Sequence, residues 1–290
     1  MTIIVRLKGG LGNQMFQYAA GRRLSELHAT NLKLDISILP KYARSYELGH
    51  LSIHEDFATT QEVAALTGGN EKWLGDLGNR LRQMTVPYYQ RSYFSEPHLT
   101  PYDPNILRTP REVCLEGFWE SEKYFLEISN IIRQEFKIKD PPDSKNKQLA
   151  ERIVKTESVS IHVRRGDYLQ LQDIFGNPTL NYYAKCISII QEEIQNPNFF
   201  VFSDDPQWTS SNLRLDHPTT IVSQNDSKNY EDLRLMSLCK HNIIANSSFS
   251  WWAAWLNSNE RKLVLAPTPW FTQRDSRDVI PSGWIKIPKV

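Results

Sequence analysis

The sequence predicts an α/β protein of two domains, each a parallel β-sheet with helices on both faces. Short apolar runs, typical of buried strands, alternate with stretches of helical spacing in both halves of the chain. Between the halves, residues 139–144 carry a pair of prolines among polar residues, which is typical of a linker. The length of 290 residues is enough for two well-packed cores.

The first half opens on an apolar run and a glycine-rich turn. In order, we expect a strand at 2–7, a helix at 13–28, strands at 31–35 and 113–115, and a helix over 120–137, where apolar residues have helical spacing. Residues 36–110 are rich in tyrosine, proline and polar residues and show no clean period. For them we expect helices and long loops.

The second half alternates more clearly. Strands are expected at 158–163, 198–203, 219–223, 242–246 and 262–266, and helices near 180–195, 229–239 and 248–257. The predicted domains are therefore residues 1–143 and 144–290, both Rossmann-like and facing each other. Whether the last segment packs back on the first domain is left open.

Composition excludes some classes of protein. The 34 basic and 33 acidic residues nearly balance, so no nucleic-acid partner is expected. Three widely spaced cysteines, Cys114, Cys186 and Cys239, argue against a disulfide framework and fit a reducing compartment. The first strand is charged too early for a signal peptide or membrane span. We therefore expect a cytoplasmic protein, with a peripheral contact to the inner face of the membrane left open.

Two adjacent arginines and a histidine mark the end of the strand at 158–163. In Ile161-His162-Val163-Arg164-Arg165-Gly166-Asp167-Tyr168 the apolar run stops at the arginines. In open α/β sheets, ligands bind beyond the carboxyl ends of the strands. Guanidinium groups there match phosphate oxygens and stay charged. Taken alone, these residues fit an exposed strand end with salt-bridged arginines equally well.

A glycine-rich loop follows the first strand. Gly10 and Gly12 in Gly9-Gly10-Leu11-Gly12-Asn13-Gln14 allow a ligand to approach the backbone, and the helix start offers N–H groups. Met15 stands where the dinucleotide fingerprint has its third glycine, and no Gly-Lys-Ser/Thr follows. A tight turn alone would explain the glycines but not Asn13-Gln14.

Two further strand ends carry polar residues. Asp204 and Asp205 follow the strand at 198–203, where they could bind a nucleobase or ribose, hold a divalent metal, or simply cap the next helix. Ser247, Ser248 and Phe249 open the helix at 248–257, whose N-terminus is a ready anion site unless a serine only caps it. The tryptophans of that helix are expected to pack it on the sheet. These are Trp251, Trp252 and Trp255.

No metal site is predicted. His50 and His54 have the spacing of a helical ligand pair, but no third ligand is obvious. The polar strand ends of the second half should instead meet along one edge of a parallel sheet. Arginine for a diphosphate, carboxylate for a base and N–H groups for phosphate oxygens together fit a nucleotide-diphosphate ligand.

Several segments carry a resemblance to a known family. His162-Val163-Arg164-Arg165-Gly166-Asp167 resembles the H-x-R-R-x-D motif of α-1,2-, α-1,6- and protein O-fucosyltransferases. Residues 9–19, 115–125 and 246–256 resemble glycosyltransferase family 11, which contains bacterial and animal α-1,2-fucosyltransferases. Glu120 stands where that family more often has glutamine.

The resemblance implies a GT-B fold, GDP-L-fucose as donor, no required cofactor or metal, and inversion at the anomeric carbon. It implies that Arg164 binds the pyrophosphate with support from Arg165, and that His162 and the Asp204-Asp205 loop hold guanine or ribose. Ser247, Ser248 and Phe249 would help to receive the phosphates. Asn13 would lie near the reacting carbon.

Inversion also requires a base near the acceptor hydroxyl. Asp167 is interpreted as a structural partner of the arginines. Asp35, Glu116 and Glu120 are the acidic candidates of the first half, and the sequence does not separate them.

The leading hypothesis is transfer of L-fucose to the 2-hydroxyl of a terminal galactoside on an oligosaccharide or a lipid-linked glycan of the cell surface. The alternatives are an α-1,6-type or protein O-fucosyltransferase and a non-catalytic GDP-sugar or glycan-binding protein. Acceptor contacts are expected from the middle of the chain, which includes Tyr88, Tyr89, Tyr93 and Phe94. Oligomeric state and acceptor identity stay open.

Overall fold

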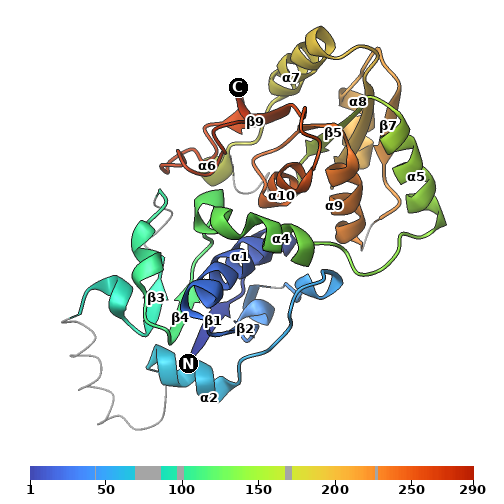
Figure 1. The fold of residues 1–290 in the computed structure, drawn as a ribbon. Helices are drawn as coiled ribbons and strands as arrows, with labels where there is room; N and C mark the ends of the chain where they lie inside the picture. The colour runs from blue at the N-terminus through green and yellow to red at the C-terminus, as the bar shows by residue number, and fades with distance from the viewer. Residues whose placement is uncertain (43, 69–85, 97–100, 167–171, 226–227) are drawn as a thin grey trace. The chain divides into compact units, whose positions relative to one another are not determined.

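The computed structural model describes residues 1–42, 44–68, 86–96, 101–166, 172–225 and 228–290. The chain divides into two compact units, Met1–Lys137 and Ile138–Val290. Each unit contains one sheet, and within both sheets every strand pair is parallel. The predicted α/β class with two parallel sheets is therefore confirmed (Figure 1).

The first unit has a four-stranded sheet in the order β2-β1-β4-β3. Its strands are β1 (Thr2–Arg6), β2 (Asn31–Asp35), β3 (Tyr93–Ser95) and β4 (Val113–Glu116). Its α-helices are α1 (Leu11–His28), α2 (Thr60–Thr67) and α4 (Ser129–Glu135). Short 3-10 helices occupy Leu39–Tyr42, Leu48–His50, Tyr88–Gln90, Pro104–Arg108, Glu122–Tyr124 and Leu126–Ile128.

The second unit has a six-stranded sheet in the order β10-β9-β8-β5-β6-β7. Its strands are β5 (Ser158–Val163), β6 (Asn198–Ser203), β7 (Thr219–Val222), β8 (His241–Ile243), β9 (Val264–Thr268) and β10 (Ile285–Pro288). Its helices are α5 (Ser144–Lys155), α6 (Gln172–Phe175), α7 (Leu180–Glu193), α8 (Pro206–Asn212), α9 (Asn229–Leu238) and α10 (Ser248–Leu256).

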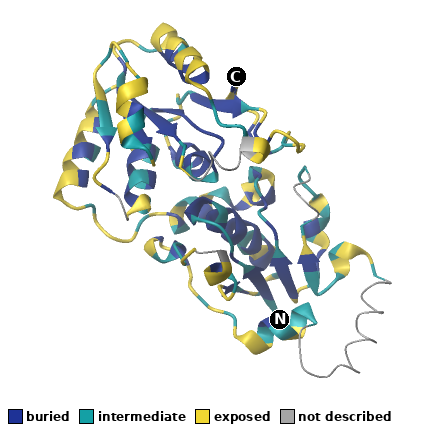
Figure 2. Ribbon diagram, turned by 180° about the vertical axis from the view of Figure 1, so that it is seen from behind, coloured by how far each residue is buried: buried dark blue, intermediate teal, exposed yellow. Residues whose placement is uncertain are grey.

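Burial explains why β5 and β6 form where the sequence predicts them. Every residue of β5 is buried, as expected for a parallel strand covered on both faces. Val159, Ile161 and Val163 form one core cluster with α7. His162 points the other way, toward Phe249 of α10, because side chains alternate along a strand. Helices α7 and α10 therefore cover opposite faces of this sheet, and the strands form the buried interior (Figure 2).

One predicted helix is wrong in its first half. Residues 120–137 were expected to form a single helix, but two 3-10 turns precede α4. Phe125 has a φ of −141° and a ψ of 7°, which lie outside the helical region and interrupt the helix. The interruption allows the adjacent Tyr124 and Phe125 both to be buried, whereas neighbours on an α-helix point about 100° apart.

Candidate functional site

The order in which the chain adds strands to the second sheet reverses beside β5. From β5 the chain proceeds outward through β6 to β7, and it then returns to place β8 on the other side of β5. Ligands of open α/β sheets bind at such a switch point, outside the carboxyl ends of the strands. The ends of β8, β5 and β6 lie side by side there, which is the meeting of polar strand ends that the sequence predicts.

Arg164 and Asp204 come together at this edge. Arg164 Nη1 lies 3.1 Å from Asp204 Oδ2, and Asp204 Oδ1 accepts a hydrogen bond from the backbone N–H of Arg165 at 2.9 Å. Gly166 makes the pair possible, because a Cβ there would lie 2.8 Å from Asp204 Oδ2. The side chain of Arg164 is about a quarter exposed, which leaves room for an anion to approach it.

Arg165 and Asp205 have partners within the fold. The Arg165 guanidinium stacks on the Trp208 ring, with its carbon 3.6 Å from the ring centroid. Asp205 caps α8 by accepting a hydrogen bond from the Trp208 N–H at 3.0 Å. Arg165 Nε lies 3.7 Å from Asp205 Oδ2, which is an ion pair too long for a hydrogen bond. The capping alternative considered from the sequence is therefore what Asp205 does, while Asp204 faces Arg164.

His162 is a buried, uncharged imidazole beside this arginine. Its side chain lies with its ring centroid 5.7 Å from that of Phe249. Burial, with a smaller effect of the Arg164 charge, lowers the pKa of His162 to about 3. Its Nδ1 is buried and has no hydrogen-bond partner among the described residues. A buried polar atom of this kind calls for a partner, which a bound ligand could supply.

The start of α10 lies next to His162. Ser247 is the N-cap of α10 and is buried, but its side chain makes no capping hydrogen bond in the described structure. Ser248 and Phe249 form the first turn. Trp251, Trp252 and Trp255 are buried as predicted, and Trp251 Nε1 donates to the Val279 carbonyl at 2.7 Å. The tryptophans fix the helix, so its N-terminus stays beside the arginine edge.

In the first unit, the glycine loop turns at a residue that sequence reasoning missed. Gly9 has a φ of +79°, and a Cβ there would lie 2.4 Å from Asn13 Nδ2. Gly10 is the N-cap of α1 and Gly12 lies buried in its first turn. The predicted site residue Asn13 thus lies directly against Gly9. A positive φ cannot be read from three glycines in one loop, which is why Gly9 was not singled out.

Two glutamines hold this loop in place. Gln14 donates to the carbonyls of Gly9 and Ser45, both at 2.9 Å. Gln17 accepts from the Lys8 N–H at 3.0 Å and donates to the Gly117 carbonyl at 3.0 Å. Both side chains are fully buried. The loop after β1 is therefore fixed to the turn after β4.

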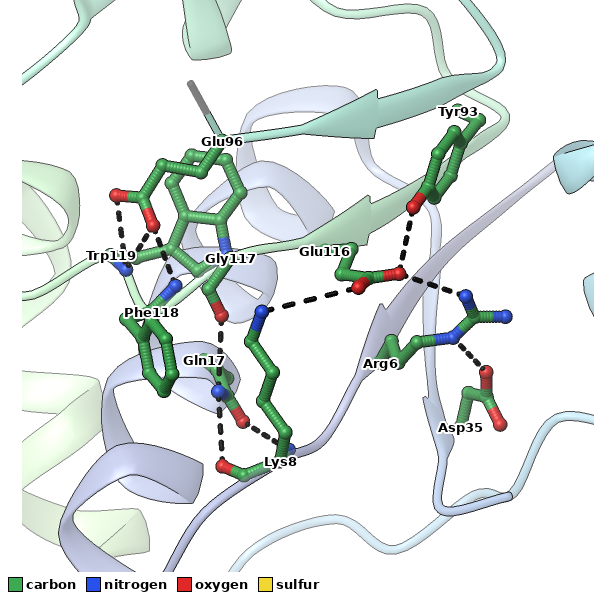
Figure 3. A network of polar contacts seen from close by, with 10 residues as sticks. All are labelled: Arg6, Lys8, Gln17, Asp35, Tyr93, Glu96, Glu116, Gly117, Phe118 and Trp119. Atoms are coloured by element: carbon green, nitrogen blue, oxygen red, sulfur yellow. Dashed lines mark hydrogen bonds and ion pairs between the residues drawn. The ribbon is translucent and has the colours of Figure 1, made fainter. Parts of the chain in front are cut away.

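A network of charged residues occupies the carboxyl edge of the first sheet (Figure 3). Arg6 donates from Nε to Asp35 and from Nη1 to Glu116, both at 2.8 Å. Tyr93 Oη donates to Glu116 at 2.7 Å, and Lys8 Nζ lies 4.0 Å from the other oxygen of Glu116. Four segments of the sheet edge, from β1 to β4, thus contribute to one cluster.

Glu96 was not among the predicted acids, because it lies in the aperiodic middle of the sequence. It accepts hydrogen bonds from the backbone N–H of Phe118 at 2.6 Å and of Trp119 at 3.3 Å. Burial raises its pKa. Trp119 has a φ of +56°, and Gly117 leaves room for Glu96, since a Cβ there would lie 2.6 Å from Glu96 Cβ. Glu96 therefore holds the turn after β4 in its unusual conformation.

The structure also bears on the predictions about Asp167, the cysteines, metal ligands and membrane spans. Asp167 lies outside the described residues. The three cysteines are free and buried. No three His, Cys, Asp or Glu side chains within the described ranges lie together as ligands for a metal ion. In the same ranges, none of the helices is long and apolar enough to cross a membrane.

Residues 88–288 match the family model described as glycosyl transferase family 11. An Escherichia coli alpha-1,2-colitosyltransferase is 34% identical over 307 aligned positions, which cover 100% of both chains. The O-antigen biosynthesis glycosyltransferase WbnK of the same species is 29% identical, covering 97% of this chain and 99% of its own. A galactoside alpha-(1,2)-fucosyltransferase 1 from Ateles belzebuth is 26% identical over 86% of this chain and 63% of the relative.

Solved structures share the fold. Arabidopsis thaliana FUT1, in a complex with GDP, superimposes with a TM-score of 0.52 at 14% identity, covering 97% of this chain and 72% of the other. The fucosyltransferase NodZ from Bradyrhizobium gives a TM-score of 0.50 at 13% identity over 87% and 91% of the two chains. The fold is therefore GT-B-like, as predicted.

Proposed function

Because the chain belongs to glycosyltransferase family 11, we propose that it moves L-fucose from GDP-L-fucose to the 2-hydroxyl of a terminal galactoside, with inversion at the anomeric carbon. Two relatives, the alpha-1,2-colitosyltransferase and the galactoside alpha-(1,2)-fucosyltransferase, are named for forming a 1,2 linkage, which supports this proposal. The α-1,6-type and protein O-fucosyltransferase alternatives are disfavoured by the family match over residues 88–288.

The position of Arg164 gives the proposed function its main structural support. It lies at the carboxyl end of β5, at the switch point of the second sheet, with the N-terminus of α10 following the neighbouring strand β8. Departure of GDP builds negative charge on the β-phosphate, so a guanidinium placed there binds the transition state more tightly than the ground state. Arg164 thereby lowers the barrier to cleavage of the sugar–phosphate bond.

The remaining residues of this edge have supporting roles. Arg165, stacked on Trp208, stabilises the conformation of the chain at the end of β5 and adds positive charge there. The neutral His162 and the carboxylate of Asp204 are suited to hydrogen bonding with guanine or ribose. Ser247, Ser248 and Phe249 offer the N–H groups of a helix start to phosphate oxygens. Asn13, on the first unit, is proposed to contact the sugar at its reacting carbon.

We propose that the reaction needs no metal. Arginines and a helix N-terminus together can balance the charge that a divalent cation balances in other sugar transferases. The expected result is that EDTA leaves the rate of transfer unchanged. A rate that EDTA abolishes and Mg²⁺ or Mn²⁺ restores would contradict this part of the proposal.

A second donor is favoured by one observation. The relative at 34% identity over the whole chain is a colitosyltransferase, and colitose is L-fucose without its 3-hydroxyl. Discrimination between the two donors depends on whether the site hydrogen-bonds that hydroxyl, because a polar group left without its partner costs affinity. Comparing kcat/KM for GDP-fucose and GDP-colitose with one acceptor decides between them.

The acceptor and the location complete the proposal. We propose a galactose-terminated oligosaccharide or lipid-linked glycan as acceptor, used on the cytoplasmic side with a peripheral contact to the membrane. One relative is named for O-antigen biosynthesis, which supports a surface-glycan acceptor. Cell fractionation tests the location, and a panel of free and lipid-linked galactosides tests the acceptor.

The test of the proposed function is release of GDP from GDP-L-fucose with and without a galactoside acceptor. Release that requires the acceptor supports a transferase. Tight GDP binding without transfer to any member of the panel would favour a non-catalytic GDP-sugar-binding protein. Absence of GDP binding would contradict the role given to Arg164.

A further inference from the structure

The first sheet also has a switch point, between β1 and β4. The chain passes from β1 to β2 on one side and then crosses to β3, with β4 inserted next to β1. Ile3, Ile4 and Val5 of β1 pair with residues 113–115 of β4, so the carboxyl ends of these two strands are adjacent. Arg6 ends the first of these strands and Lys8 follows it, while Glu116 ends the second. This edge is where an open α/β unit binds its ligand.

The acids at this edge differ in how many of their oxygens are occupied. Asp35 accepts from Arg6 at 2.8 Å with Oδ2 and from the Ser37 N–H at 3.0 Å with Oδ1, and its side chain is 2% exposed. Both oxygens of Glu96 accept from backbone N–H groups of Phe118 and Trp119. Every carboxylate oxygen of these two acids therefore already accepts a hydrogen bond within the fold.

Glu116 is different. Its Oε2 accepts from Arg6 Nη1 at 2.8 Å and from Tyr93 Oη at 2.7 Å, which fixes the carboxylate in place. Its Oε1 accepts no hydrogen bond from any described residue, and Lys8 Nζ lies 4.0 Å away. The side chain is 22% exposed. Glu116 thus combines a fixed carboxylate with one oxygen that has no hydrogen-bond donor among the described residues.

We propose that Glu116 is the catalytic base, and that its Oε1 accepts first the hydrogen bond and then the proton of the acceptor hydroxyl. This inference rests on the proposed function. As the acceptor oxygen bonds to the anomeric carbon, the bond from that carbon to the β-phosphate oxygen breaks and its electron pair leaves with GDP. The hydroxyl proton passes to Oε1, and the neutral acid later loses it to water.

The surroundings keep Glu116 ionised and ready. Burial raises the pKa of Glu116, but hydrogen bonds from Tyr93 and Arg6, together with the charges of Arg6 and Lys8, hold it below its usual value. Among the described residues, the other titratable groups facing this cluster are Asp35, Cys114 and, beside Lys8, Glu96. Burial and Glu116 raise the pKa of Tyr93 to about 12, so its hydroxyl remains a donor throughout the working range.

Lys8 is itself held in place. Its ammonium lies 4.5 Å from the centroid of the Phe118 ring, and its backbone is bound by Gln17 on both sides. The cation therefore stays beside Oε1 and favours the charged form of Glu116. Close to the reacting hydroxyl, the same ammonium and the half-buried ring of Phe118 could contact the acceptor sugar.

The test is Glu116→Gln, which preserves size and removes the base. We expect kcat to fall by about a hundredfold to ten-thousandfold, the range of a lost general base, with the Kd for GDP unchanged. Glu116→Asp should recover part of the rate. Glu135→Gln is the matched control, because Glu135 also accepts from a tyrosine and an arginine, Tyr18 at 2.8 Å and Arg22 at 2.9 Å, away from the sheet edge. It should lower stability and leave kcat near the wild-type value.

The pH profile distinguishes a base from a structural carboxylate. Tyr93→Phe removes a donor to the ionised form, so the pKa of Glu116 should rise and the acidic limb of kcat/KM should move to higher pH. Lys8→Met should move it in the same direction.

Provided that the wild type transfers sugar, two results would overturn the inference. One is a wild-type kcat in Glu116→Gln. The other is an acidic limb of kcat/KM that stays at the same pH in both Tyr93→Phe and Lys8→Met. A wild type that transfers nothing from GDP-fucose or GDP-colitose would instead refute the proposed function and, with it, this inference.

Discussion

Arg164 is the side chain on which the proposed donor chemistry most depends. Arg164→Ala should reduce turnover by about a hundredfold or more, the usual loss when one donor to developing charge is removed. The melting temperature should change little, because the partly exposed pair with Asp204 contributes little to stability. Parallel measurement of GDP release and thermal unfolding checks both, with the exposed Arg261→Ala as control. Near-normal turnover in the Arg164 variant would refute the phosphate role.

His162 should make stability depend on pH. Its pKa is lowered by burial to about 3 in the folded chain, so between that value and its ordinary pKa the unfolded chain binds a proton that the folded chain does not. Stability is then complete above the ordinary pKa and falls as pH decreases. From about pH 7 to about pH 5 the wild type should lose about 2 kcal/mol more than His162→Gln. Urea unfolding at both pH values measures this, and equal losses would contradict the buried, neutral imidazole.

Only part of this residue-level detail could be predicted from the sequence. The arginines at 164 and 165 could be placed at a strand end because the apolar run before them is unambiguous. That Arg165 stacks on Trp208, and that Glu96 holds Trp119 at a positive φ, depends on packing between segments far apart in the chain. Periodicity carries no information on such contacts.

At the level of secondary-structure elements, α1 packs closely against β1 and β2 at Gly21. A Cβ on Gly21 would lie 2.2 Å from Val5 Cγ2 and 2.9 Å from Leu32 Cδ1. Gly21→Ala should therefore destabilise the protein by about 1–3 kcal/mol through overpacking. Gly283→Ala is the matched control, since nothing lies within 4 Å of a Cβ there. Chemical denaturation compares the two, and equal stability would mean that α1 can move away from the sheet.

Elements were predictable where they are long and uniformly buried. Strands β5 and β6 begin and end at the predicted residues, because both faces are covered and the apolar runs are continuous. β3 has three residues within the aperiodic middle, and β10 lies near the end of the chain with a proline as its last residue. Neither gives a periodic signal. β8 ends at Ile243 rather than at residue 246, since the chain turns there toward the start of α10.

At the scale of the whole molecule, each unit carries polar residues at the switch point of its own sheet. The second unit presents Arg164 and a helix N-terminus, which suit a nucleotide diphosphate, and the first presents Glu116 with Arg6 and Lys8. The sequence predicted the edge of the second unit from three strand ends. For the first unit it named Asp35 and Glu116 as acidic candidates but did not predict that they lie at one edge, because strand order, and hence the adjacency of β1 and β4, is not encoded in local pattern.

This division predicts which segments each ligand protects. GDP alone should slow amide hydrogen exchange at the end of β5, at residues 203–205 and in the first turn of α10, because binding stabilises the folded form of the segments that contact it. An acceptor galactoside should add protection at the turn after β4. Exchange measured by mass spectrometry with each ligand checks the assignment. Protection by GDP confined to Met1–Lys137 would contradict it.

The linkage of the product shows whether the protein transfers a fucose-type sugar to the 2-hydroxyl of a galactoside. The wild-type protein is incubated with GDP-L-fucose and lactose, and the purified trisaccharide is analysed by NMR. We predict an α-linked fucose on the 2-hydroxyl of galactose. A fucose on any other hydroxyl, or a β-linked fucose formed with retention of configuration, would contradict the proposed function.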